Sequence, residues 1–389
     1  MRRLLRKAFD LALGALMLPM VSIMSLMAQT TTPPPQTFSA TVYLDYRYYL
    51  TQDGPWTLKP SDPATAYLSN QFIFRRAYFT YENKISDNLK FRFRLDADNT
   101  ANVTGVTLTG SPVSGATLSK DDKLRPFIKH LYLEYANFIV PKMILNVGMI
   151  ETLTFKPAEE RWGLRSVAKT LVDGYQDITK ASIAASSADI GATLKYSFVK
   201  QFRVAGGIYN GTHYSHAEND QYKEVELQAQ FSPLAGLSFV GYYDYERKLP
   251  VAALPAETAP QTVTYKLDAF FEMVKNLVIG AEWFTFKSDL NQTAGEKYDR
   301  GGTSVFGRYV LKPDKLQLFA RYDIYKPNSL DEGLDMSVII AGFDWAPYSA
   351  TWKLQPNIWF FDYTDGSRYN AGATANSDMI FNLTFFLSF

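Results

Sequence analysis

The chain of 389 residues is long enough for two ordinary domains or for one large barrel. Its 40 basic and 39 acidic residues nearly balance, so no overall charge draws it toward nucleic acid, and the absence of cysteine excludes disulfides and thiolate metal sites. Aromatic residues make up 15% of the chain although the mean hydropathy is only -0.16, a combination typical of proteins with interfacial or membrane belts.

Residues 1 to 28 have the pattern of a secretory signal peptide. An apolar segment, Leu11 to Met27, follows a basic region and ends beside Ala28, a small residue suited to cleavage. The basic residues are Arg2, Arg3, Arg6 and Lys7. The apolar segment is also just long enough for a membrane-spanning helix, but Pro19 within it favours removal. Removal leaves 36 basic and 38 acidic residues in the mature chain.

After a Pro- and Thr-rich spacer at residues 29–37, the rest of the chain, residues 38–389, alternates apolar and polar side chains in segments of similar length. In Lys90 to Asp98, for example, Phe91 and Phe93 fall on one face and Arg92 and Arg94 on the other. The sequence predicts sixteen strands, near residues 38–50, 70–83, 88–100, 125–138, 142–151, 187–198, 200–211, 219–232, 236–247, 261–274, 276–287, 302–311, 315–325, 336–347, 351–364 and 376–389.

The connections between these strands alternate strictly between seven short turns and eight longer loops. The longer loops are residues 51–69, 101–124, 152–186, 212–218, 248–260, 288–301, 326–335 and 365–375. An even-stranded barrel with both termini on one side of a membrane requires this alternation, and outer-membrane barrels place the short turns in the periplasm. The prediction is an all-β fold, a transmembrane antiparallel β-barrel of sixteen strands.

The two faces of the predicted strands support a membrane environment. Leu318, Tyr322 and Ile324 share one face of their strand, while Arg321 and Asp323 share the other. Charged residues that repeatedly face inward form a wet lumen, and sixteen strands close a barrel wide enough for an aqueous channel. In the strand at 70–83, Arg75 and Arg76 are adjacent, so period-two alternation predicts that one of them faces outward.

The last strand carries Phe381, Leu383, Phe385, Leu387 and Phe389 on one face, which we expect to contact lipid. A terminal aromatic residue on such a strand resembles the C-terminal signal by which outer-membrane barrels are recognised for assembly. We therefore expect Phe389 to contact the barrel assembly machinery. The expected location of the protein is the cell outer membrane.

The longest predicted loop, Thr152 to Ser187, is the best candidate for narrowing the lumen. Pro157 to Val172 is predicted to form a short helix with an apolar stripe at Leu164, Val167 and Leu171. The basic stripe consists of Arg161, Arg165 and Lys169. If the loop folds inward, the apolar stripe packs on the wall and the basic stripe faces the solute; the alternative is a solvated extracellular helix.

Three stretches together resemble the phosphate-selective porin O and P family. They are GMIETLTFKPAEERWGLRSVAKTLVDG (148–174), FIFRRAYF (72–79) and FRFRLDAD (91–98), and the strand pattern extends the resemblance over essentially the whole mature chain. The resemblance implies a commonly trimeric outer-membrane barrel that passes small inorganic or organic anions through a constriction formed by an inward-folded third loop. By position, Arg161, Arg165, Lys169 and Glu159 are then the constriction residues.

The predicted lumen departs from the arginine ladder of the phosphate-selective members of that family, because its basic and acidic residues are mixed. The lumen-lining candidates are Arg92, Arg94, Asp96, His130, Glu134, Arg203, Arg308 and Arg321. The favoured function is passive diffusion of small hydrophilic solutes with a weak preference for anions, phosphate being one candidate. The alternative is a non-conducting structural or adhesive barrel that binds partners through its external loops.

Other functions have little support in the sequence. His213, His216 and Glu218 offer metal-type ligands, but on a loop without a fixed spacing to a third ligand, so no metal site or cofactor is expected. A lipase needs a serine beside a histidine, and no serine adjoins His130 in its strand, so no enzyme is expected. Phosphate-cradling loops and nucleic-acid-binding stripes are also missing from the sequence.

Overall fold

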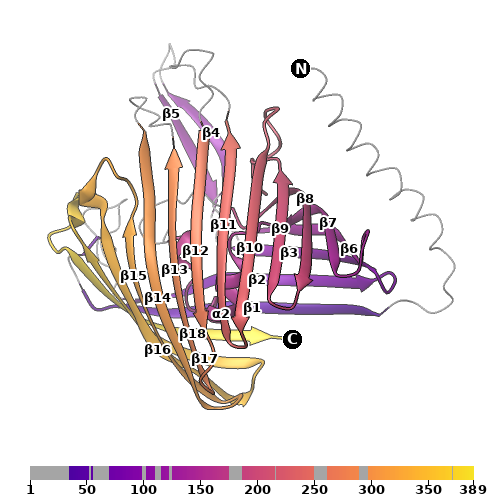
Figure 1. Ribbon diagram of the computed structural model, residues 1–389. Coiled ribbons are helices and arrows are strands. Elements are labelled where there is room, and N and C mark those ends of the chain that lie inside the picture. The colour runs from indigo at the N-terminus through magenta and orange to yellow at the C-terminus, as the bar shows by residue number, and fades with distance from the viewer. Residues whose placement is uncertain are drawn as a thin grey trace.

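The computed structural model describes residues 35–51, 54–55, 70–98, 102–109, 115–121, 125–174, 186–214, 216–248, 261–288, 297–369 and 371–389. The predicted signal peptide, residues 1–28, lies outside these residues, as does most of the spacer. Sixteen strands pair antiparallel into one closed barrel, with β18 against β1 at the point of closure and β3 against β6 (Figure 1). Closure satisfies every strand edge, which a sheet in lipid requires.

The barrel strands are β1 (Gln36–Tyr49), β2 (Asn70–Lys84), β3 (Leu89–Asp98), β6 (Arg125–Ala136), β7 (Met143–Glu151), β8 (Ala188–Val199), β9 (Phe202–Tyr209), β10 (Glu224–Leu234), β11 (Leu237–Arg247), β12 (Gln261–Phe271), β13 (Leu277–Ser288), β14 (Tyr298–Lys312), β15 (Leu316–Lys326), β16 (Met336–Ser349), β17 (Trp352–Tyr363) and β18 (Ser377–Ser388). The sixteen-stranded prediction is confirmed. Within the described residues, the helices are α2 (Lys156–Trp162) and three 3₁₀ turns, η1 (Leu171–Asp173), η2 (Glu332–Leu334) and η3 (Gly366–Arg368). None of the described helices is long and apolar enough to cross a membrane.

The predicted loop at residues 101–124 contains two strands that the sequence analysis missed. β4 (Asn102–Thr109) and β5 (Gly115–Asp121) pair antiparallel in a separate two-stranded sheet. Figure 1 shows this hairpin at the top of the view. It connects β3 to β6 and explains why those two strands are neighbours although they are not consecutive.

Side chains alternate between the two faces of the wall as the sequence predicted. On β12, Lys266 is only 1% exposed whereas the flanking Tyr265 and Leu267 are 43% and 59% exposed. On β15, Arg321 and Asp323 are buried inside the barrel and Tyr322 lies on the outside. An outer face of apolar and aromatic side chains is the surface that lipid requires.

The short turns use residues that tolerate left-handed backbone conformations. Asn276 and Asp314 have φ of 67° and 55°, and both lie in turns between consecutive barrel strands. Asn and Asp adopt this region more readily than other side chains because they form local hydrogen bonds. The turns therefore end the strands without disturbing the barrel pairing.

A β-bulge in β2 corrects the prediction that either Arg75 or Arg76 faces outward. The β1–β2 register skips Arg75, because Arg76 pairs with Tyr43 and Phe74 with Leu44. The extra residue breaks the period of two, so both arginines contact groups inside the barrel. Arg75 lies 2.8 Å from Asp45 and Arg76 lies 3.2 Å from Asp96.

A second bulge breaks the period of two in β6. The β3–β6 register skips Lys129, because His130 pairs with Arg94 and Ile128 with Leu95. Lys129 and His130 are consequently both buried, at 4% and 3% exposure. Together the two bulges bring additional nitrogen-bearing side chains to the same part of the inner wall.

Candidate functional site

The loop that follows β7 folds into the barrel, and we call its described residues 152–174 the lumenal loop. The predicted helix over Pro157 to Val172 is shorter than expected, because α2 ends at Trp162. Gly163 stops it by taking a left-handed conformation, φ 63°, with its N–H donating to the carbonyl of Glu159 at 2.8 Å. This is the usual glycine end of a helix. Proline stands in the first turn, as predicted.

The apolar side of the lumenal loop packs on an apolar part of the inner wall. Leu164, Val167 and Leu171 are 0%, 2% and 0% exposed, so the predicted apolar stripe does face the wall although it is not on one helix. The wall residues in this cluster include Phe270, Phe284, Phe306, Phe319, Val338, Ile340 and Phe361, which come from strands β12 to β17. Burial on this scale makes the loop a fixed part of the barrel interior.

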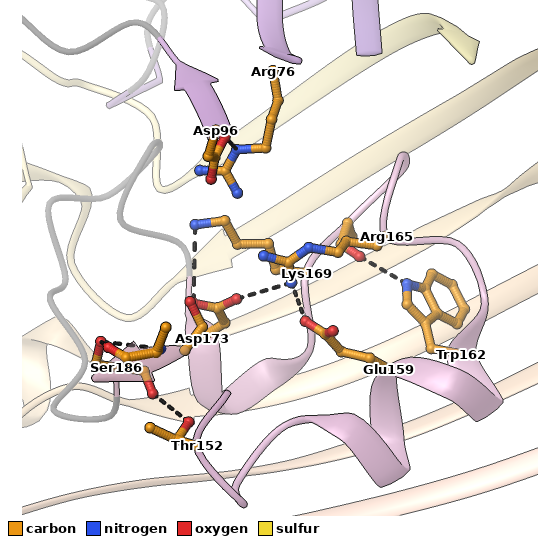
Figure 2. Close-up of polar contacts among 12 residues, drawn as sticks. Arg76, Asp96, Thr152, Glu159, Trp162, Arg165, Lys169, Asp173 and Ser186 are labelled. Atoms are coloured by element: carbon orange, nitrogen blue, oxygen red, sulfur yellow. Dashed lines mark hydrogen bonds and ion pairs between the residues drawn. The ribbon is translucent and has the colours of Figure 1, made fainter. Parts of the chain in front are cut away.

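Trp162 is the largest side chain of this contact. Its ring meets Phe306 and Phe319 edge-on, with centroid separations of 5.4 Å and 5.9 Å. Its Nε1 donates to the carbonyl of Ala168 at 2.8 Å, so the polar end of the buried ring is satisfied within the loop (Figure 2). The ring of Trp162 therefore holds the loop on the wall, and its Nε1 hydrogen bond stabilises the fold of the loop itself.

Arginines of the wall hold the backbone of the lumenal loop. Arg308 donates from Nε to the carbonyl of Arg161 at 2.8 Å, and Arg321 donates to the carbonyl of Lys169. From the other side, Arg75 donates to the carbonyls of Ser166 and Val167, the latter at 3.0 Å. Two side chains predicted to line the lumen, Arg308 and Arg321, thus anchor the loop, each through a charge-assisted bond.

The first residues of the loop are held by polar groups of β10 and β11. Leu153 donates its N–H to Glu226 at 2.8 Å, and Gln228 donates to the Leu153 carbonyl. Glu226 also accepts from the hydroxyl of Tyr242, at 2.8 Å. The loop is therefore attached near its beginning as well as along its middle.

The charged side of the lumenal loop carries paired side chains (Figure 2). Arg165 contacts the carboxylates of both Glu159 and Asp173, the second at 3.2 Å, and Lys169 lies 4.0 Å from Asp173. Although burial acts to lower the pKa of Arg165, Glu159 and its other partners raise it well above its ordinary value. Arg165 is therefore a permanent cation on this face of the loop.

Burial raises the pKa of Glu159 above its ordinary 4.5, and the nearby charge of Arg165 only partly opposes this effect. Burial also acts to raise the pKa of Asp173, but Lys169 and Arg165 outweigh it and hold that pKa below 3.8. The two carboxylates around Arg165 therefore differ in how readily they take up a proton.

Between the charged side of the loop and the wall formed by β1, β2, β3, β6 and β7 lies a cavity of about 340 Å³, which we call the slot. Five basic side chains line it: Arg92, Arg94, Lys129, Lys156 and Arg165. Three acidic side chains line it: Glu151, Glu159 and Glu160. The slot is therefore polar, carries charges of both signs and has an excess of basic groups.

The four residues predicted for the constriction fall into two groups. Glu159 and Arg165 line the slot. Arg161 lies outside its lining, with its guanidinium 3.5 Å from Glu272 and stacked over Phe270 at 5.2 Å. Lys169 also lies outside the lining, beside Asp173. The difference arises because the helix ends at Gly163, which breaks the 100° spacing that put the basic residues on one stripe.

Of the predicted lumen residues, Arg92, Arg94 and His130 line the slot. Asp96 is fully buried against Arg76, and Glu134 pairs with Lys90 at 3.4 Å. Arg203 lies on β9 beside the short turn that joins it to β8, away from the slot. Three of the eight predicted lumen residues therefore share the slot, and the sequence did not show which of them would meet in one cavity.

Several other inward charges are paired with one another within the wall. Lys266 lies 2.5 Å from Asp268 and 3.4 Å from Glu282, and all three are almost completely buried. Arg321 lies 2.6 Å from Asp323 in the same way. Direct partners replace hydration in both groups. Arg321 with Asp323 leaves no formal net charge, whereas Lys266 with Asp268 and Glu282 leaves one formal negative charge.

Lys129 and Tyr78 are slot residues that the sequence analysis missed. The sequence analysis missed Lys129 because the bulge changes the face of the strand on which this residue lies. The sequence feature that could have revealed the bulge is the adjacent polar pair Lys129 and His130. Tyr78 was hidden because an inward tyrosine has no distinguishing pattern. Adjacent polar pairs in an otherwise alternating strand are thus a usable sign of bulges in a barrel.

The residues considered for other chemistry form no site in the described part of the chain. No three His, Asp or Glu side chains there are placed to hold a metal ion. Glu218 instead accepts from Lys223 at 2.6 Å, and His213 donates its main-chain N–H to Asp189. The ring of His130 lies 3.9 Å from Glu151 and makes no hydrogen bond to a serine among the described residues.

Phe389 exchanges two main-chain hydrogen bonds with Ala40 of β1, of 2.7 Å and 3.0 Å, and its side chain is 78% exposed. The terminal residue is thus part of the β1–β18 seam. Its recognition by assembly machinery stays a prediction.

No protein-family model matches the chain, and no curated protein sequence matches it. Several solved structures, in contrast, match the chain. The complex of Salmonella typhi OmpF with daunomycin matches with a TM-score of 0.59 and 11% identity, over 92% of this chain and 98% of that one. The anion-selective porin from Comamonas acidovorans matches with a TM-score of 0.58 and 11% identity, over 91% of this chain and 99% of that one.

The trimer form of in-vitro folded OmpT, an outer membrane protein of Vibrio cholerae, matches with a TM-score of 0.53 and 12% identity, over 92% of this chain and 100% of that one. At identities this low the likeness concerns the fold alone. The chain has the closed sixteen-stranded barrel of outer-membrane porins.

Proposed function

We propose that the protein is an outer-membrane porin, a water-filled channel for the passive diffusion of small hydrophilic solutes with a weak preference for anions. The observation that carries the proposal is the slot: five basic and three acidic side chains face one cavity between the wall and an inward-folded loop. Pore selectivity depends on the charges at such a narrowing. The apolar side chains exposed on the outer wall support a barrel in lipid.

The mixed lining supports a weak preference and not a strict one. Each basic group in the slot lowers the energy of a passing anion, while Glu151, Glu159 and Glu160 raise it. Phosphate belongs to the proposed solutes as one small anion among others, since the slot shows no uninterrupted row of arginines. The resemblance of residues 72–79, 91–98 and 148–174 to the phosphate-selective porin O and P family supports the anion preference.

We further propose a homotrimer in the outer membrane, inserted by the barrel assembly machinery. The support is the fold shared with the trimer form of a Vibrio cholerae outer membrane protein. The exposed aromatic side chains of β1 and β2, Phe38 and Phe72, offer an apolar surface that lipid or a second subunit can cover.

The test is single-channel conductance and reversal potential of the refolded mature chain in a planar bilayer with a salt gradient. We expect a stable conductance with a small anion preference that decreases in Arg92→Gln plus Arg94→Gln. The control is Lys84→Gln plus Lys312→Gln, which removes the same charge from positions beside short turns and outside the slot lining. A folded barrel that does not conduct would favour the surface-structural alternative, and a cation preference would contradict the proposed selectivity.

A further inference from the structure

Three guanidinium groups surround one tyrosine, Tyr78 of β2, at the wall of the slot. The guanidinium carbons of Arg94 and Arg76 lie 5.1 Å and 5.6 Å from the centre of its ring. Arg76 donates to its hydroxyl at 3.2 Å, and Arg165 donates to the same oxygen at 3.4 Å. The ring attracts the cations of Arg94 and Arg76 through the negative charge on its face, whereas Arg165 contacts only the hydroxyl.

These arginines come from different parts of the structure. Arg76 lies on β2, Arg94 on β3, and Arg165 on the lumenal loop, so Tyr78 connects two wall strands to the loop across the slot. Its own ring is 7% exposed and packs edge-on against Tyr43, at 6.1 Å. A ring fixed in this way provides a rigid surface for flexible arginine side chains.

The three arginines differ in their acidic partners. Arg76 is paired with Asp96, and Arg165 with Glu159 and Asp173. Arg94, in contrast, forms no ion pair within 4.0 Å among the described residues; its Nε donates to the hydroxyl of Thr80 at 2.8 Å. The terminal nitrogens of Arg94 therefore retain unused donors on a side chain that lines the slot.

We propose that Tyr78 is a positioning residue for selectivity: by holding the Arg94 guanidinium against its ring, it directs the unused donors of that group toward anions in the slot. This inference rests on the proposed porin function and adds the residue through which the anion preference is set. The ring supplies orientation without adding a charge. A carboxylate in the same place would neutralise Arg94, whereas a tyrosine leaves its positive charge available to the solute.

The experiment measures reversal potentials of the refolded mature chain carrying Tyr78→Leu, Tyr78→Phe or Arg94→Gln, in the same salt gradient. Tyr78→Leu removes the ring, and we expect the anion-to-cation permeability ratio to decrease by about twofold to fivefold, the factor that corresponds to one cation–π contact. Tyr78→Phe keeps the ring, so we expect it to decrease the anion-to-cation permeability ratio less than Tyr78→Leu does. The matched control is Tyr298→Leu, which removes a tyrosine that holds Arg300 in the same manner, at 5.0 Å, but outside the slot.

A double mutant separates positioning from general packing. If Tyr78 acts through Arg94, then Tyr78→Leu plus Arg94→Gln should have the permeability ratio of Arg94→Gln alone. Losses that multiply in the double mutant, or a wild-type ratio in Tyr78→Leu, overturn the inference. If Tyr78→Leu does not fold, a loss in Tyr78→Phe as large as that in Arg94→Gln overturns it. If the wild-type barrel does not conduct, the proposed porin function itself is wrong, and this outcome is distinguishable from a failure of the role of Tyr78.

Discussion

Arg308 of β14 donates a hydrogen bond of 2.8 Å from its Nε to the main-chain carbonyl of Arg161 in the lumenal loop. One basic side chain of the wall is therefore used to hold a loop that itself carries basic side chains. The bond spans 147 positions in the sequence. Arginine suits this role because its fixed fork of donors remains charged in any surroundings.

Replacing Arg308 with glutamine should loosen the lumenal loop. We expect a loss of about 1.5 to 3 kcal/mol in the free energy that holds the loop, the usual contribution of a hydrogen bond from a charged group. The measurement is the open-channel current noise, which should increase. Arg203→Gln is the control, since this inward arginine makes no hydrogen bond to the loop within the described residues, and equal noise in both variants would contradict the anchoring role.

Leu164→Ala should weaken the loop through its apolar side. Leu164 is 0% exposed in the cluster between loop and wall, and truncating such a side chain costs about 2 to 5 kcal/mol. The midpoint of guanidinium unfolding or the heat stability of the refolded barrel measures the effect. Leu318→Ala is the comparison, because Leu318 lies on the outer face at 44% exposure and should have a smaller effect.

Gly163→Ala tests the end of α2. The φ of 63° costs an L-residue about 1 to 2 kcal/mol, and the added carbon would lie 2.9 Å from the Nη1 atom of Arg308, the flexible end of that side chain. We expect a moderate decrease in thermal stability. Gly307→Ala should be nearly neutral, because the nearest atom to its added carbon is 3.9 Å away; equal losses in both variants would argue against a backbone cause.

Acidification should strengthen the anion preference. The pKa of Glu159 is raised above 4.5 and that of Asp173 is held below 3.8, so as the pH falls Glu159 is protonated first and a negative charge disappears from the slot. The charges that act on the Glu159 carboxyl are those of Arg165, Asp173, Glu151 and Lys129. Reversal potentials measured from neutral pH downward should shift toward anions, beginning above pH 4.5.

In Glu159→Gln this pH-dependent step should be absent, and the preference at neutral pH should already be that of the acidified protein. Asp87→Asn, in the exposed turn between β2 and β3, should keep the step. A step of unchanged size in Glu159→Gln would assign it to another group.

Arg165 and Arg161 should differ in their effect on selectivity although both were expected at the constriction. Arg165 lines the slot, so Arg165→Gln removes the cation paired with Glu159 and leaves Asp173 with Lys169. This change should shift the reversal potential toward cations. Arg161 lies outside the slot lining, so Arg161→Gln should have little effect on it. The same shift in both variants would show that the permeation path passes Arg161.

The sequence predicted most of the barrel because a wall between lipid and a polar interior enforces a period of two. Lys266 between Tyr265 and Leu267 is an example, since each residue lies on the face that its polarity requires. The strand count followed from this alternation and from the alternating loop lengths. The β4–β5 hairpin was missed because it stands outside the wall and the same pattern is not imposed on it.

The site was less predictable because it depends on departures from regularity. The bulges at Arg75 and Lys129 move single residues to the other face, and the left-handed Gly163 divides the expected helix. The apolar part of the inner wall was missed as well: Phe306 and Phe319 face inward where a wet lumen was expected, because the lumenal loop covers them. Only a three-dimensional match between loop and wall reveals that arrangement.

This covered wall limits how the barrel can be engineered. Shortening the lumenal loop is an obvious way to widen a pore, yet here it would uncover Phe306, Phe319 and their neighbours to water, with a cost that grows with the apolar area exposed. In such a barrel, part of the channel wall would be apolar and would bind detergent or amphiphilic solutes. To widen the pore, we would instead replace slot-lining side chains of β2 and β3 with smaller ones, because the wall there is already polar.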